Sequence, residues 1–115
     1  MTDFGLDVRE ANGIVILETD GYLNNIAGEK IAEVCSEKLE EDKKMFLINL
    51  ERTKVVNSIG VSILIEIIEK LQGVNGKLGY YNLVPIVEKT FNIMGLTKYS
   101  TIFPSEEDGL EAFAD

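Results

Sequence analysis

Residues 54–72 read KVVNSIGVSILIEIIEKLQ, and this stretch constrains how the rest of the chain can fold. It begins as a polar turn that contains Asn57, Ser58 and Gly60, and it continues as a strongly apolar run. At 100° per residue the aliphatic side chains cover an arc of roughly 240°, wider than the stripe of an ordinary surface helix. We therefore expect a helix over 59–72 that is covered on most sides. Gly60 lies near the middle of the arc, where a missing side chain would let the first turn approach the sheet.

The segments around this helix alternate between extended and helical patterns. Asn12-Gly13 separates two β-rich runs and predicts a hairpin, because both residue types tolerate positive φ. Pro85 suits the first turn of a helix that Gly95 ends, and Ser105 precedes a run of acids typical of a helix start. The expected strands are 4–10, 14–19, 45–50, 78–81 and 99–103, and the expected helices are 26–39, 59–72, one from Pro85 to Gly95 and one after Ser105.

The order β-β-α-β-α-β-α-β-α predicts an α/β fold in which one sheet has parallel pairs joined by right-handed crossovers. Asn24 or Asn25 can cap the helix over 26–39. The apolar positions of that helix fall on one face that should turn inward: Ile26, Ala27, Ile31, Val34, Cys35 and Leu39.

Composition narrows the functional classes. The 115 residues suit one domain over 1–115, and 45% of them are apolar. With a net charge of −9 and only 11 basic residues, the chain has no footprint for nucleic acid. No apolar run reaches the length of a membrane span, so we expect no direct membrane insertion. Cys35 is the only cysteine, and a buried free thiol suits a cytoplasmic protein.

Catalysis has few residues available to it. The chain contains no histidine, which excludes Ser-His-Asp and Cys-His mechanisms and any histidine-based zinc site. The loop Gly73-Val74-Asn75-Gly76 lacks the Lys and Ser/Thr of a phosphate-binding loop. The acidic clusters are typical of solvated helix faces. We therefore expect a protein that is not an enzyme and that has no cofactor or metal site.

Three segments in this order resemble the STAS domain, a family named for sulfate transporters and bacterial anti-sigma factor antagonists. They are GYLN before the first helix, LINLERTKVVNSIGVSIL, and KLGYYNLVPIVEKTFNIMGLTKYSTIF. The resemblance implies a mixed sheet of about five strands with four helices, mainly on one face. It also implies binding to a kinase-type anti-sigma factor, and the free-standing length resembles the antagonist proteins. In that system phosphorylation by the kinase ends the interaction.

The resemblance also shows where this chain departs from the family. The family loop before the second helix typically reads Asp-Ser-Ser/Thr-Gly, and the residue before the glycine receives the phosphate. Here the loop reads Asn57-Ser58-Ile59-Gly60, so Ile59 stands where the phosphoacceptor is expected. The family's Gly-x-Leu-Asp is Gly-Tyr-Leu-Asn here, with Asn24 in place of the acid.

Two interpretations of this loop remain open. Ser58 could take the phosphate one residue early, at a helix N-terminus that favours added negative charge. However, a shift of one residue turns a side chain by about 100° away from the usual acceptor direction. We favour the second interpretation, a permanently unphosphorylated binding module with Asn57 or Ser58 as the helix cap. The expected partner surface consists of Asn24, Asn57, Ser58, Ser62 and Ile65.

Other functions stay open as alternatives. The mouth of the second helix could sense a nucleotide or another anion, because helix N-termini bind anions readily. A domain of this kind could also serve as a subunit of a membrane transport complex. The oligomeric state is open, since the wide apolar arc could be buried within the domain or in a symmetric dimer.

Overall fold

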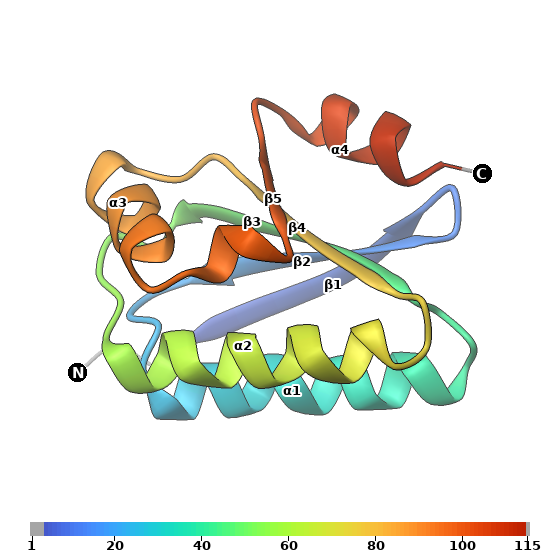
Figure 1. The fold of residues 1–115 in the computed structure, drawn as a ribbon, viewed down its shortest axis with the longest axis horizontal. Coiled ribbons are helices and arrows are strands. Elements are labelled where there is room, and N and C mark those ends of the chain that lie inside the picture. The colour runs from blue at the N-terminus through green and yellow to red at the C-terminus, as the bar shows by residue number, and fades with distance from the viewer. Residues whose placement is uncertain (1–3, 115) are drawn as a thin grey trace.

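Five strands form one mixed sheet in the computed structural model, which describes residues 4–114 (Figure 1). β1 (Gly5–Ala11) and β2 (Ile14–Asp20) form the expected antiparallel hairpin, and Asn12 and Gly13 at its turn have positive φ of 54° and 80°. The remaining elements are α1 (Asn25–Glu40), β3 (Met45–Arg52), α2 (Ser58–Gln72), β4 (Lys77–Tyr81), α3 (Pro85–Ile93), the 3₁₀ helix η1 (Leu96–Lys98), β5 (Thr101–Phe103) and α4 (Glu106–Phe113).

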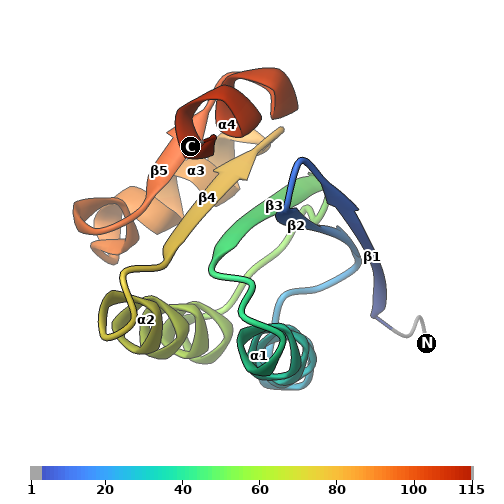
Figure 2. The same cartoon turned by 90° about the vertical axis from the view of Figure 1, so that its right-hand side faces the viewer.

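The strand order explains why the helices gather on one face. The strands lie in the order β1-β2-β3-β4-β5, and β2 to β5 are parallel to one another. A right-handed crossover that always steps in the same direction across a sheet leaves its helix on the same face each time. α1, α2 and α3 are such crossovers and pack on one face, whereas α4 follows the last strand and covers the other (Figure 2). The expected mixed sheet with helices mainly on one face is confirmed.

The last strand is shorter than expected. Residues Tyr99 and Ser100 follow η1 and belong to a turn, and β5 begins only at Thr101. The Ser100 hydroxyl donates a hydrogen bond to the carbonyl of Leu96, which holds this turn against η1. This local hydrogen bond holds Ser100 in a bend, so the strand pairing of β5 starts one residue later.

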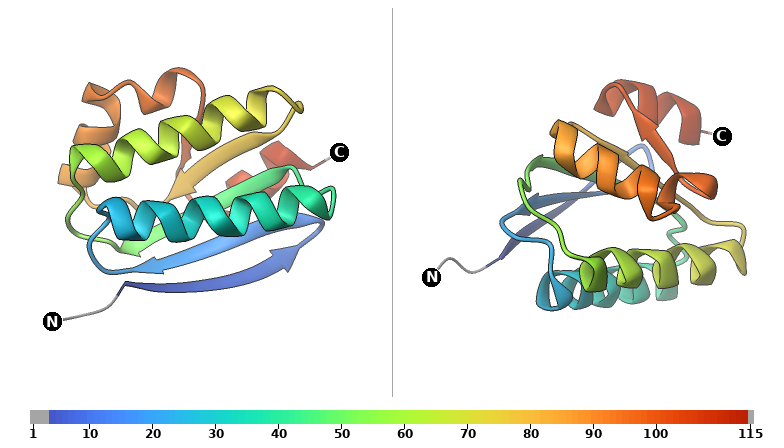
Figure 3. Two further views of the ribbon diagram at one scale, coloured as in Figure 1. Left: turned by 90° about the horizontal axis from the view of Figure 1, so that it is seen from below. Right: turned by 60° about the vertical axis from the view of Figure 1, so that its left-hand side comes forward.

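α2 is the most buried of the helices on this face. Its inward side chains form the centre of the main core together with α1 and the strands. α1 and α2 lie side by side on the sheet (Figure 3). They approach closely at Gly28, where a Cβ atom would lie 2.9 Å from Cδ1 of Ile63. The apolar arc of α2 is only partly covered, because Ile63 and Ile65 are half-buried and Ile59 is exposed. The fully covered members of α2 are Gly60, Val61, Leu64, Ile67, Ile68 and Leu71.

Candidate functional site

α1, α2 and α3 all begin at the carboxyl ends of the parallel strands, at the left of Figure 1. In open sheets of this kind, binding sites form outside these strand ends. The loop after β2 and the loop after β3 are joined there by backbone hydrogen bonds. Leu23 N–H donates to the carbonyl of Val55 over 3.0 Å, and Asn57 N–H donates to the carbonyl of Leu23 over 3.1 Å. The N-terminal ends of α1 and α2, which we call the helix mouths, are therefore fixed relative to each other.

An asparagine caps each of these helices. The Asn24 side-chain oxygen accepts a hydrogen bond from Ala27 N–H at 3.0 Å, and the Asn57 oxygen accepts one from Gly60 N–H at 2.8 Å. Both caps are half-buried. The capping residue of α1 is therefore Asn24 and not Asn25, and that of α2 is Asn57 and not Ser58. Ser58 is the first residue of α2 and is exposed.

Gly60 brings the two loops together. A Cβ atom at this position would collide with the carbonyl group of Leu23 and would lie 3.1 Å from the carbonyl oxygen of Asn24. The close approach is therefore to Leu23, in the segment just after β2, rather than to one of the five strands themselves. Leu23 pairs with Val56 in an isolated parallel bridge, so the backbone that Gly60 approaches continues the pairing of β2 and β3 beyond the strands.

Four large apolar side chains are exposed around the two caps, and we call them the apolar rim: Tyr22, Ile26, Val55 and Ile59. Their exposed fractions lie between 46% and 56%. Ile26 and Ile59 each follow their capping asparagine by two residues. The expectation that Ile26 faces inward is wrong, because Ile26 lies about 100° before Ala27 around α1, on the side away from the buried residues Ala27, Gly28, Ile31 and Cys35. Clustered exposed apolar side chains of this kind mark interaction sites.

Two basic side chains and the positive ends of two helix dipoles lie near the rim. Neither α1 nor α2 has an acid in its first turn, so the positive ends of both helix dipoles are uncompensated there. Lys54 and Arg52 lie with Tyr22 and Val55 around a shallow hollow of about 310 Å³. Asp20 pairs with Arg52 at 3.9 Å. Because Asp20 offsets Arg52, Lys54 is the base at this hollow that has no ion-pair partner among residues 4–114.

The expected partner residues separate into two places. The structure brings Asn24, Asn57 and Ser58 to the same edge, and Ser62 lies one turn further along α2, where its hydroxyl donates to the Ser58 carbonyl at 2.8 Å. Ile65 lies about 10 Å from Ser58 along the helix axis and lines a groove toward η1. The sequence analysis did not identify the rim, although an apolar residue two positions after each capping asparagine is the signal that could have shown part of it.

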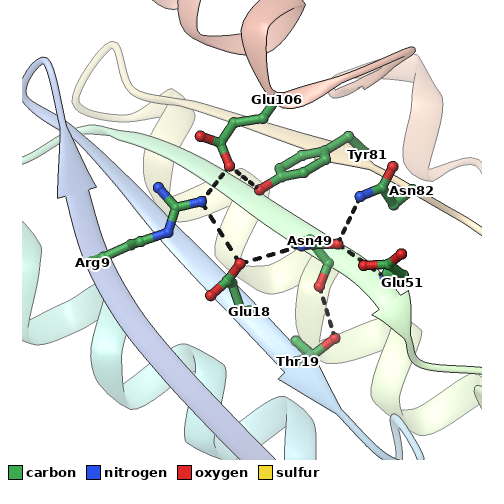
Figure 4. A network of polar contacts seen from close by, with 8 residues as sticks. All are labelled: Arg9, Glu18, Thr19, Asn49, Glu51, Tyr81, Asn82 and Glu106. Carbon is green, nitrogen blue, oxygen red and sulfur yellow. Dashed lines mark hydrogen bonds and ion pairs between the residues drawn. The ribbon is translucent and has the colours of Figure 1, made fainter.

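The opposite face of the sheet carries a polar network (Figure 4). Arg9 bonds to Glu106 and lies 3.7 Å from Glu18, and the Tyr81 hydroxyl donates to Glu106 at 2.7 Å. Hydrogen bonds from Arg9 and Tyr81 lower the pKa of Glu106, and the hydrogen bond to Glu106 raises the pKa of Arg9. A carboxylate held in its charged form does not serve as a general acid. The network instead ties the start of α4 to β1 and β4.

Other groups with chemical potential are confined. Burial raises the pKa of the Cys35 thiol to about 12, so this thiol stays protonated and unreactive at neutral pH. Within residues 4–114, no three acidic or cysteine side chains are grouped so that they could hold a metal ion. No helix in that range is long and apolar enough to cross a membrane.

The STAS domain family model matches residues 5–109, and the chain therefore belongs to this family. Among solved structures, the anti-sigma factor antagonist SpoIIAA in its unphosphorylated form matches at 22% identity and a TM-score of 0.72, covering 96% of each chain. The phosphorylated form of Bacillus SpoIIAA has the same identity and TM-score over 94% of this chain and 98% of its own. An anti-sigma factor antagonist from Mycobacterium paratuberculosis matches at 20% identity and a TM-score of 0.84, over 98% of this chain and 96% of its own. These similarities establish an antagonist-like fold.

Proposed function

We propose that this chain is an antagonist-like regulatory module that docks a kinase-type anti-sigma factor through the carboxyl edge of its sheet. The observation that carries the proposal is the apolar rim, which surrounds the capped mouths of α1 and α2. None of the four rim side chains belongs to the hydrophobic core, and all four are exposed at one edge of the sheet. The similarity to SpoIIAA, an anti-sigma factor antagonist, supports this class of partner.

We further propose that Ile59 removes the usual covalent switch. Its side chain is 56% exposed at the mouth of α2, and it has no hydroxyl to receive a phosphate. An exposed isoleucine here adds apolar contact area for a partner, but it cannot be phosphorylated. The partner surface then comprises Asn24, Asn57, Ser58 and Ser62 together with the apolar rim.

Ser58 carries the competing proposal, a phospho-switched antagonist, because its side chain is exposed at a helix N-terminus. Phosphate there would interact favourably with the free N–H groups of the first turn. The two proposals differ in one measurable product, which is a phosphorylated Ser58.

Intact-mass measurement after incubation with the kinase-type anti-sigma factor and ATP separates them. The wild-type chain should gain no phosphate. The Ile59→Ser variant should gain one, and that phosphate should survive the additional Ser58→Ala change. A stoichiometric phosphate on the wild type that disappears in Ser58→Ala would overturn the proposal for Ile59 in favour of Ser58.

Calorimetry with the same anti-sigma factor tests the docking surface itself. Burying one exposed isoleucine contributes up to about 2 kcal/mol, so Ile59→Asp should weaken binding by more than 10-fold. Val74→Asp is a matched control, because Val74 is also an exposed aliphatic but lies beyond the other end of α2. Equal effects of both variants, or no effect of Ile59→Asp, would refute docking at the rim.

A further inference from the structure

A second apolar surface lies away from the rim, along the carboxyl-terminal half of α2. In Figure 3 the α3–η1 segment lies beside α2 on the side away from α1. Between α2 and η1 runs a groove of about 400 Å³, which we call the α2–η1 groove. It is lined by Ile65, Ile68, Glu69, Gln72, Met94, Gly95, Leu96, Lys98 and Tyr99.

Tyr99 stands at this groove with 69% of its side chain exposed. Among the large apolar and aromatic side chains of residues 4–114 only Ile93, on the adjoining α3, is more exposed, at 73%. Tyrosine supplies a large, rigid contact area at interfaces and is enriched there. The same surface thus carries both a groove and an exposed aromatic side chain beside it.

The excess negative charge of the chain does not lie on the elements that form the α2–η1 groove. α2, α3 and η1 together carry three acids and three lysines: Glu66, Glu69, Glu88, Lys70, Lys89 and Lys98. By contrast, α4 carries four acids and no base, namely Glu106, Glu107, Asp108 and Glu111. α1 carries four acids against two lysines. A partner selected by charge would find no net charge here, and two copies of this face would not repel each other.

The charges at the groove are also self-complementary. Glu69 lies on α2 and Lys98 on η1, and neither has an ion-pair partner among the described residues. A two-fold axis turns one copy so that each surface meets its own image, with residue i against j and j against i. Such an axis through the groove can bring Lys98 of one copy to Glu69 of the other, and Tyr99 of each copy to the groove of the other.

We propose that the α2–η1 groove is the interface of a two-fold symmetric dimer of this chain. The dimer buries Tyr99, Ile65 and Met94 and pairs Lys98 with Glu69 of the second copy. Because Glu69 lies about 16 Å along α2 from Ser58, the apolar rim stays open for a different partner. The dimer stands independently of the docking function proposed above.

Sedimentation velocity on the full chain, between 1 μM and 1 mM at about 0.15 M NaCl, tests the proposal. The wild type should show a concentration-dependent dimer, and Tyr99→Ser should raise the dissociation constant at least 10-fold. Tyr22→Ser is the matched control, since it removes an exposed tyrosine of the rim and should leave the dimer unchanged. Thermal melts of both variants should match the wild type because both side chains are exposed.

Charge reversal tests the pairing across the axis. Glu69→Lys and Lys98→Glu should each weaken the dimer, and the double variant should restore it. A wild type that stays monomeric up to 1 mM would overturn the proposal and leave the groove to another protein. A dimer that is sensitive to Tyr22→Ser but not to Tyr99→Ser would overturn it as well, because the rim would then be the interface.

Discussion

Replacing Asn57 by aspartate tests how much the mouth of α2 contributes to stability. The Asn57 oxygen accepts the Gly60 N–H at 2.8 Å, and a carboxylate of the same shape can make that bond with a full negative charge. The first turn of α2 contains no acid, so the dipole of this helix is uncompensated. We therefore expect Asn57→Asp to stabilise the fold at neutral pH.

The magnitude follows from the position of the charge. An acid at a helix N-terminus contributes about 0.3–1 kcal/mol, whereas removing the cap in Asn57→Ala costs about 1 kcal/mol. The hydrogen bond and the dipole favour the charged form, so the pKa of the new carboxyl should be lower in the folded than in the unfolded chain. The added stability is present above the unfolded pKa of about 4 and is lost as the pH falls through the folded pKa.

Urea unfolding at pH 7 and at pH 3 measures both effects. With a slope of about 2 kcal/mol per molar urea, the midpoint of Asn57→Asp should rise by about 0.15–0.5 M at pH 7, and this gain should shrink at pH 3. Asn75→Asp adds the same charge after the carboxyl end of α2 and should not stabilise. If Asn57→Asp is no more stable than Asn75→Asp at pH 7, the capping geometry does not act as described.

Three further predictions concern single residues. Gly60→Ala should destabilise the fold by about 1–3 kcal/mol in urea unfolding, because the added Cβ meets backbone of the neighbouring loop. Gly73→Ala, at an ordinary φ of −66°, should be near neutral, and equal losses of stability in the two variants would contradict this explanation. Because Arg9 lowers the pKa of Glu106, the wild type should lose more stability than Glu106→Gln as the pH falls below about 4.5, and parallel pH profiles would argue against the ion pair. The Cys35 thiol should react with a thiol-specific chromogenic disulfide at pH 8 only after unfolding in guanidinium, and rapid reaction of the native chain would show that it is not buried.

Only those features of the candidate site that depend on residues close together in the chain could be predicted from the sequence. The resemblance to the family identified the loop with Asn57 and Ile59, and the capping preference of asparagine correctly indicated how α1 and α2 begin. Ile26 was misplaced because it lies about 100° before Ala27 around α1, outside the arc of residues that the helix buries. The same geometry applies to Ile59, which lies about 100° before Gly60 around α2, away from the buried side chains of that helix.

The amino-acid sequence alone determined the element order, the hairpin turn at Asn12 and Gly13, the capped helices and hence the α/β sheet with its crossovers. These features depend on contacts and backbone preferences within a few residues, which a linear pattern contains. Only the tertiary structure decided that the two helix mouths lie side by side, that Gly60 rests on the Leu23 carbonyl, and that four apolar side chains surround them. Those neighbours are distant in the chain, and they meet because β2 and β3 pair in parallel and end at the same edge.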